Sequence, residues 1–278
     1  MLSTSGQNIL IVGGAKGIGR EACRLLLATN CRLIVFDHDR IALANLTHEL
    51  NGEHATLTVD IADRAAVSKA LQWLDEHVGK LDAVVICAAV HGAYPAEFMP
   101  DDLIEKILGV NLIAHIKLVR DLLPLVKDGG KIIGVSSNCA DIGIPMESVY
   151  AASKAGLERF YEGLSIEISY RKIRPIVIHP GNVNTGFNET GNVYVSRGNA
   201  FVDAGYQRIV EAIDSRNGIA PQVVALTIVQ ALRAARPRFR YMVGLNAIKA
   251  HWAKRLLGTR LALRLMAKFF GFRFFYDT

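Results

Sequence analysis

The segment Gly13-Gly14-Ala15-Lys16-Gly17-Ile18-Gly19 directly follows the short apolar run Asn8–Val12 and opens a segment of helical character. Its glycines at 13, 17 and 19 have the spacing G-x-x-x-G-x-G. Such a loop turns sharply and lets backbone N–H groups approach a pyrophosphate, which side chains would prevent. The helix that follows would direct its positive N-terminus toward the phosphates. The segment therefore predicts a dinucleotide-binding loop, with a purely structural tight turn as the alternative.

Short apolar runs alternate with helical patterns outward from this loop. The expected strands are Asn8–Val12, Arg32–Phe36, Thr56–Val59, Ala83–Cys87, Lys131–Val135 and Pro175–Ile178. The expected helices are Glu21–Ala28, His38–Asn51, Ala65–Val78, Leu103–Val126 and Val149–Ser169. Continuous apolar strands that alternate with helices are typical of a parallel sheet covered on both faces. Right-handed crossovers then predict an α/β fold, with a doubly wound, Rossmann-type parallel sheet in three α/β/α layers.

The chain is interpreted as one catalytic domain, residues 1–240, followed by a basic, apolar, helical C-terminal extension, residues 241–278. No repeat, low-complexity tract or linker divides the body of the sequence. Gly186–Gly205 is polar, has no clear periodicity and comes directly after a strand. We expect a mobile substrate flap at about residues 186–220, the alternative being a plain surface connection.

Charged residues near the glycine loop bear on the choice of cofactor. Asp37 closes the second expected strand, 18 residues after Gly19. A carboxylate there can accept both ribose hydroxyls and repels a 2′-phosphate, whereas Lys16 could hold that phosphate. We rank Asp37 above Lys16 and expect NAD, with NADP as the alternative. Asp60 closes the third strand and could bind the adenine edge, although both acids could instead only cap helices.

Tyr150-Ala-Ala-Ser-Lys154 places a phenol and an ammonium on one helical face. A free phenol has a pKa of about 10, which must fall by about 3 for it to act as a base near neutral pH. Lys154 and a positive nicotinamide ring are expected to lower that pKa. Ser137 follows the expected strand Lys131–Val135, and its hydroxyl could hold the substrate oxygen.

In their order along the chain, these motifs resemble those of the short-chain dehydrogenase/reductase family, from Asn8 to about Leu232. The glycine loop is similar to the family's T-G-x-x-x-G-x-G, with Val12 in place of the Thr. The other matches are Val59-Asp60, Val110-Asn111, Ser136-Ser137, Tyr150-Ala-Ala-Ser-Lys154 and Pro180-Gly181-Asn182-Val183-Asn184-Thr185. The family's N-N-A-G reads Ile86-Cys87-Ala88-Ala89 here, a departure that bears on local hydrogen bonding and not on the catalytic residues.

The resemblance implies reversible hydride transfer between NAD(P) and a secondary alcohol or ketone. Tyr150 would move the hydroxyl proton and Ser137 would orient the substrate oxygen. Lys154 would hold the nicotinamide ribose, and Asn111 would order a water that relays the proton. The implied cofactor contacts are Gly13, Lys16, Gly17, Ile18, Gly19, Asp37, Asp60, Ile61, Ala88, Tyr150, Lys154, Pro180, Gly181, Val183 and Thr185. A homodimer or homotetramer is also implied.

The C-terminal region is strongly basic. Residues 233–278 contain eleven Lys/Arg and one acid, whereas residues 1–232 contain 21 basic and 25 acidic residues. In the apolar stretch His251–Phe275, Arg260, Arg264 and Lys268 recur every four residues. These charges are too frequent for a membrane-spanning helix of about 20 apolar residues. A helix in the membrane interface fits this pattern, and the alternatives are a cap over the substrate cleft or a homodimer contact.

The tail, together with Phe187 and Phe201, favours a lipophilic substrate such as a steroid, retinoid or lipid alcohol. A cofactor-binding sensor or scaffold protein with little turnover is the alternative. No motif indicates nucleic-acid binding. The four cysteines lack C-x-x-C spacing and are joined by no histidine cluster, so buried thiols and no metal site are expected. With no visible signal peptide, we expect a cytoplasmic protein with peripheral membrane contact as one role for the tail.

Overall fold

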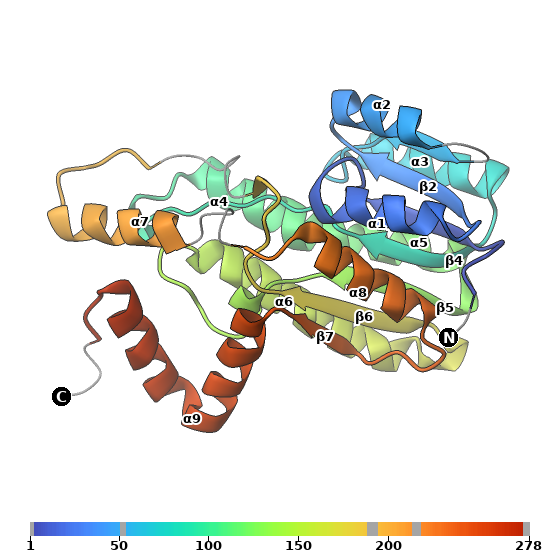
Figure 1. The fold of residues 1–278 in the computed structure, drawn as a ribbon. Helices are drawn as coiled ribbons and strands as arrows, with labels where there is room; N and C mark the ends of the chain where they lie inside the picture. The colour runs from blue at the N-terminus through green and yellow to red at the C-terminus, as the bar shows by residue number, and fades with distance from the viewer. Residues whose placement is uncertain (1–2, 51–53, 188–193, 213–217, 275–278) are drawn as a thin grey trace.

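The computed structural model describes residues 3–50, 54–187, 194–212 and 218–274, which form a parallel sheet with helices on both faces (Figure 1). The strands are β1 Asn8–Val12, β2 Arg32–Asp37, β3 Ala55–Thr58, β4 Leu81–Ile86, β5 Val126–Val135, β6 Arg174–Pro180 and β7 Arg240–Val243. They lie in the order β3-β2-β1-β4-β5-β6-β7, and every neighbouring pair is parallel. The order reverses between β1 and β4, where open sheets of this kind bind ligands. The predicted α/β fold with a doubly wound parallel sheet is confirmed.

Two apolar clusters fill the space between the sheet and its two helical layers. The helices are α1 Gly17–Leu27, α2 Arg40–Glu49, α3 Arg64–His77, α4 Asp101–Leu108, α5 His115–Leu122, α6 Ser148–Glu167, α7 Ala200–Ala212, α8 Pro221–Arg233 and α9 Leu245–Phe270. One cluster holds residues of α3, α5 and α6, among them Leu74 and Leu157. The other holds residues of α1, α2 and α8, among them Leu26 and Ile228. The strands supply side chains to both clusters, which is why their sequences are apolar throughout.

The helix expected at Leu103–Val126 is interrupted in the structure. A π-helical turn, Gly109–Ala114, separates α4 from α5, and a 3-10 turn ends the segment at Leu125. β5 then begins at Val126 rather than at Lys131, with an irregular register against β4. These are backbone features that apolar periodicity does not reveal.

Three elements after β6 were not predicted, namely α7, α8 and β7. α8 begins with Pro221 and buries Val224 and Ile228, a signal that the sequence does contain. β7 carries the sheet to Val243, past the boundary expected at residue 240. α7 begins at residue 200, within the segment Gly186–Gly205 whose sequence has no clear periodicity. The rest of the expected flap includes residues 188–193 and 213–217, which lie outside the described residues.

α9 consists of two helical arms joined at Gly258, whose φ of 73° and ψ of 166° interrupt the helix. The arms form the red V below the sheet in Figure 1. The second arm contacts α7, where Arg208 donates to the Gly271 carbonyl at 3.1 Å. Phe270 of this arm belongs to the same apolar cluster as Tyr150. The C-terminal extension therefore packs onto α7 and the apolar cluster that contains Tyr150.

Candidate active site

The glycine loop between β1 and α1 is packed too tightly to hold side chains. A Cβ at Gly13 would lie 2.5 Å from the Ala88 nitrogen, and one at Gly19 would lie 2.1 Å from the Gly13 carbonyl oxygen. The Cys87 and Ala88 amides both donate to the Val12 carbonyl, at 2.7 and 3.1 Å. Backbone hydrogen bonds therefore hold the segment after β4 against the end of β1, at the place where this sequence lacks the family's asparagines. The N-terminus of α1, which begins at Gly17, fits a pyrophosphate group.

Asp37 ends β2 beside the glycine loop and is 7% exposed. Its Oδ2 accepts from the Ala15 amide and its Oδ1 from the Asp39 amide, both at 2.9 Å. A carboxylate has about four lone-pair sites, so capacity remains for ribose hydroxyls. Lys16 is paired with Asp39 at 2.5 Å. This end of the site thus presents two carboxylates and one ammonium.

Ser137, Tyr150 and Lys154 meet where β5 ends and α6 begins. Lys154 lies one helical turn after Tyr150, with its Nζ 5.7 Å from the centre of the phenol ring. The ammonium donates to the Val135 carbonyl at 3.0 Å. The Ser137 hydroxyl accepts from the Cys139 amide at 3.3 Å and is a hydrogen-bond partner of Tyr150. The sequence-predicted Ser, Tyr and Lys therefore form one contiguous group.

Burial governs protonation in this group. Burial raises the pKa of Tyr150 well above its usual range, Cys139 and Glu147 act in the same direction, and the Ser137 hydrogen bond opposes them. Burial lowers the pKa of Lys154 to about 8. In the protein alone Tyr150 is a protonated phenol, and the lowering expected from Lys154 is absent. The reason is that desolvation of the buried phenolate dominates, and Lys154 is not among the groups that shift the pKa of Tyr150.

Asn111 lies in the π-helical turn and is completely buried. Its Oδ1 accepts from the Val90 amide and its Nδ2 donates to the Val90 carbonyl, both at 2.8 Å. The same Nδ2 lies 3.2 Å from the Ser153 Oγ. The Asn111 side chain therefore fixes the loop after β4 against α6 and does not line the cavity described next. The water-ordering role expected for it stays a prediction.

A cavity of about 1390 Å³ joins the cofactor loop to the catalytic group and the tail. The predicted site residues that line it are Gly13, Lys16, Gly17, Ile18, Gly19, Asp37, Asp60, Ile61, Ala88, Ser137, Tyr150, Lys154, Pro180, Gly181, Val183 and Thr185. Thr185 lies beside the glycine loop, since a Cβ at Gly17 would be 3.3 Å from it. The second arm of α9 adds an apolar wall, made of Ala262, Leu265, Met266, Phe269 and Phe270.

Three polar residues beside Tyr150 were not predicted as site residues, namely His91, Cys139 and Glu147. All three line the cavity, and His91 is hydrogen-bonded to Glu147. Glu147 precedes Tyr150 by three residues, a spacing that the sequence shows. His91 lies 56 residues before Glu147, and no local pattern links the two.

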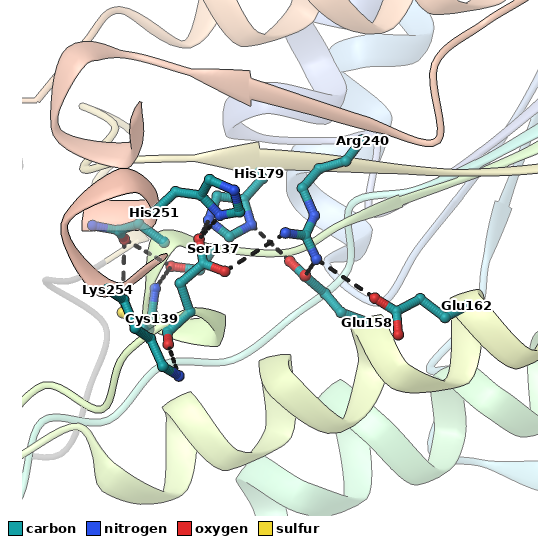
Figure 2. Close-up of polar contacts among 10 residues, drawn as sticks. Ser137, Cys139, Glu158, Glu162, His179, Arg240, His251 and Lys254 are labelled. Atoms are coloured by element: carbon teal, nitrogen blue, oxygen red, sulfur yellow. Dashed lines mark hydrogen bonds and ion pairs between the residues drawn. The ribbon is translucent and has the colours of Figure 1, made fainter. Parts of the chain in front are cut away.

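A second polar network fastens α9 to the catalytic segment (Figure 2). We call it the tail network. Its members are Asp141, Glu158, His179, Arg240, His251 and Lys254. Asp141 follows the 3-10 turn Asn138–Ala140, and its Oδ2 lies 3.0 Å from His251 Nδ1 and 3.1 Å from His179 Nε2. Lys254 donates to the Asp141 carbonyl. The first arm of α9 is thus tied to the segment that begins at Ser137.

Family comparison agrees with this site. The family model for short chain dehydrogenases matches residues 7–193, and the chain belongs to the short-chain dehydrogenase/reductase family. It is an NAD(P)-dependent oxidoreductase that acts on CH–OH groups of a small-molecule substrate.

Two curated relatives align over most of the chain. The 3-ketodihydrosphingosine reductase of Bacteroides thetaiotaomicron is 26% identical over 244 residues, which are 86% of this chain and 88% of that protein. The NADPH-dependent 3-dehydrocapnine reductase of Ornithobacterium rhinotracheale is 26% identical over 273 residues, 93% of this chain and 95% of that protein.

Solved structures share the fold. A short chain dehydrogenase/reductase from Burkholderia phymatum in complex with NAD has a TM-score of 0.80 at 21% identity, covering 95% of this chain and 97% of that one. A short-chain dehydrogenase from Streptomyces avermitilis has a TM-score of 0.82 at 20% identity over the same shares. Within the described part of this chain, no helix has the length and apolar character needed to cross a bilayer.

Proposed function

We propose that this enzyme interconverts a secondary alcohol and a ketone on a lipophilic molecule, with NAD as the preferred cofactor. The observation that carries the proposal is that Ser137, Tyr150 and Lys154 line the same cavity as the glycine loop and the apolar wall of α9. A substrate whose oxygen lies near Tyr150 would therefore share one cavity with the cofactor and with the apolar wall.

Each polar residue of the group has a role in this reaction. Tyr150 donates its proton to the ketone oxygen, or accepts one from the alcohol in the reverse direction. Its raised pKa means that the phenol carries its proton in the protein alone. Ser137 orients the oxygen, and Lys154 binds the nicotinamide ribose. The bound nicotinamide supplies or accepts the hydride.

A lipophilic substrate is supported by the wall that α9 contributes. Leu265, Met266, Phe269 and Phe270 present aliphatic and aromatic groups to the cavity, and Phe187 lines it from the segment proposed as a flap. Burial of apolar surface would contribute about 25 cal/mol for each Å² removed from water. The two relatives aligned over most of the chain are named as reductases of a 3-keto and a 3-dehydro compound. We therefore favour a ketone on a lipid chain over a steroid or retinoid.

The preference for NAD rests on charge. Asp37 and Asp39 outnumber Lys16 at the adenosine end of the cavity, and Lys16 is already paired with Asp39. A 2′-phosphate would meet two carboxylates there, whereas ribose hydroxyls can donate to Asp37. Asp60 and Ile61 line the cavity at the position proposed for adenine. The NADPH dependence in the name of one relative makes NADP the alternative.

Membrane contact, assembly and location complete the proposal. α9 carries six Lys/Arg and no acid, and its Leu256 and Phe269 are 75% and 77% exposed. This combination supports peripheral contact with a membrane surface by a cytoplasmic enzyme. Assembly as a homodimer or homotetramer rests on the family resemblance, and analytical ultracentrifugation tests it. The functional division proposed is a catalytic domain at 1–240 and an extension at 241–278.

The test is NADH absorbance during incubation with long-chain ketones, and during NAD incubation with the matching alcohols. Turnover of long-chain ketones that exceeds turnover of short ones, and that is faster with NADH than with NADPH, supports the proposal. Tight NAD binding without turnover of any ketone or alcohol would instead favour the sensor or scaffold alternative.

A further inference from the structure

A buried polar cluster lies in the cavity next to the catalytic tyrosine. Glu147 is 4% exposed and directly precedes α6. His91 Nε2 forms a short hydrogen bond with Glu147 Oε1, and the Cys139 thiol donates to Oε2 at 3.4 Å. We call these three residues the Glu147 cluster. The proton and hydride chemistry described above uses none of them.

The Glu147 cluster lies close to the reacting groups. The His91 ring is 5.0 Å from the Tyr150 ring, centre to centre, in an edge-on arrangement. Glu147 is also near enough for its charge to raise the pKa of Tyr150. A substrate whose oxygen meets Tyr150 therefore lies in the same cavity as the Glu147 carboxylate.

The backbone before Glu147 is held in an uncommon conformation. Met146 has a φ of 65°, in the left-handed region that residues other than glycine rarely adopt. Its carbonyl accepts from the Tyr94 amide at 2.6 Å, which holds the turn in place. Such strain in non-glycine residues concentrates at functional sites, because the surrounding structure must pay to maintain it. The turn thus orients Glu147 into the cavity wall at a cost in local stability.

The carboxylate of Glu147 has spare capacity for a donor. Of its roughly four lone-pair sites, one faces the imidazole and one the thiol. The thiol carries no charge, since burial raises the pKa of Cys139 well above its usual range. A buried carboxylate is costly unless a cation or several donors satisfy it. His91 is the ion-pair partner of Oε1, whereas Oε2 has the thiol; Lys154 donates to the Val135 carbonyl, and Lys106 lines the cavity as an exposed residue.

We propose that the Glu147 cluster binds a protonated amine on the substrate, close to the carbon that is oxidised or reduced. The substrate class is then a lipophilic amino ketone or amino alcohol, an inference that rests on the proposed function. An ammonium offers three donors, which suits the open lone pairs of one carboxylate. Charge-assisted hydrogen bonds of this kind are about twice as strong as neutral ones, so the amine would also set the orientation of the ketone.

The test compares two ketones that differ in one group. A long-chain α-amino ketone is assayed against the same ketone with a hydroxyl in place of the amine. For the native enzyme we expect kcat/KM to favour the amino ketone by about 30-fold or more, as for other buried charge pairs. In Glu147→Gln that preference falls to within a few-fold, through a KM that rises for the amino ketone relative to the hydroxy ketone.

Controls separate binding from other effects of the substitution. Glu162→Gln, on the same helix and outside the cavity, leaves the preference unchanged. His91→Gln retains an amide donor for Glu147 and should retain the amine preference. Circular dichroism and thermal unfolding show whether each variant is folded. Calorimetric binding of the long-chain amino alcohol against the matching diol, in the presence of NAD, gives a readout that does not require turnover.

The outcomes distinguish this inference from the proposed function. Equal kcat/KM and equal binding for the amine and hydroxyl compounds overturn the amine site and leave the ketone reductase intact. A loss in Glu147→Gln that is the same for both ketones also overturns it, because a proton relay or structural role would produce that result. Failure of every ketone with both cofactors overturns the proposed function, while selective calorimetric binding of the amine would still support the site.

Discussion

The Tyr150 ring is buried, and burial raises the pKa of its hydroxyl. A hydrogen bond with Ser137 acts in the opposite direction. We expect Tyr150→Phe to keep the fold and cofactor binding, because the ring is retained and the hydroxyl is not a core contact. Turnover should fall by a factor of about 10² to 10⁴, the usual contribution of a positioned acid or base. NADH absorbance measures turnover, and calorimetric titration with NAD measures cofactor binding.

A second buried tyrosine on α6 provides the matched control. Tyr161 is completely buried, and its hydroxyl pairs with His115 at 2.9 Å. Tyr161→Phe also removes one buried hydroxyl, at a cost in unfolding free energy of about 1 to 3 kcal/mol. It should leave kcat unchanged. Unchanged turnover in Tyr150→Phe, or equal losses in both variants, would show that Tyr150 is not the proton donor.

Cofactor choice is a second residue-scale prediction. Asp39→Asn keeps an N-cap for α2, since Asn caps helices as well as Asp does, and it releases Lys16 from its ion pair. The ratio of kcat/KM for NADPH to that for NADH should rise several-fold. Asp37→Asn should lower kcat/KM for NADH more than for NADPH. If the ratio of kcat/KM for NADPH to that for NADH were the same in the native enzyme, Asp39→Asn and Asp37→Asn, the two carboxylates would not determine cofactor choice.

Local spacing made the candidate catalytic residues predictable, and its absence hid others. The glycine loop and the Tyr150–Lys154 pair are short-range patterns whose geometry follows from one turn and one helix. His91 and Glu147 meet only because β4 and α6 are brought together by the sheet, so no local rule links them. The pKa of Tyr150 was also missed, because it depends on burial that a sequence does not contain.

At the scale of elements, the tail network joins β6, β7, α6 and α9 through buried charges (Figure 2). Burial opposes the charged form of His179, but Asp141 and Glu158 outweigh it and raise the pKa of His179. Burial likewise opposes ionisation of Asp141, yet His179 and His251 lower its pKa to about 2. These charges are anchored where the catalytic segment meets the first arm of α9.

A pH dependence of stability follows from these shifts. The contribution of His179 is complete below its unfolded pKa of about 6.5 and is lost as pH rises through its higher folded value. The contribution of Asp141 is complete above its unfolded pKa of about 3.9 and is lost as pH falls toward 2. The melting temperature should therefore decline as pH is raised from 6 to 9.

His179→Gln tests this dependence. The variant should lose about 3 kcal/mol of unfolding free energy, since it leaves buried carboxylates short of a cation. Its melting temperature should decline less between pH 6 and 9 than that of the native protein. His48→Gln, on the exposed surface of α2, serves as the control and should follow the native curve. Parallel curves for His179→Gln and the native protein would refute the assignment.

Elements were predictable where the apolar pattern is strong. β1, β2 and α6 lie within two residues of their expected bounds, because the two strands are continuous apolar runs and the buried residues of α6 recur every three or four positions. β7 has four residues and one buried side chain, too little for a pattern, and it forms only because β6 offers an open edge. The kink at Gly258 likewise depends on a backbone conformation that only tertiary packing selects.

At the scale of the whole molecule, the tail both closes the cavity and presents an apolar surface. Leu265 and Phe269 line the cavity while being 48% and 77% exposed. Of the alternatives that the sequence left open, the structure shows α9 as a wall of the cleft. The same helix carries the exposed Leu245 and Leu256, and five of its six basic residues, all except Lys254, are exposed, so contact with lipid would bring a bilayer to the cavity wall.

Membrane contact by α9 is tested best on the full-length enzyme, because the tail also lines the cavity that holds Tyr150. Sedimentation with vesicles containing phosphatidylserine should bring down the native protein, and salt should weaken this binding since each basic residue contributes about 1 kcal/mol. Leu256→Glu adds a charge at a position that is 75% exposed and does not line the cavity, and it should reduce binding several-fold with turnover of a short-chain ketone unchanged. Ile166→Glu, at a 77% exposed position on α6, is the matched control and should bind as the native protein does. Equal sedimentation of the native protein with and without vesicles, or equal losses in the two variants, would leave α9 as a wall of the active site alone.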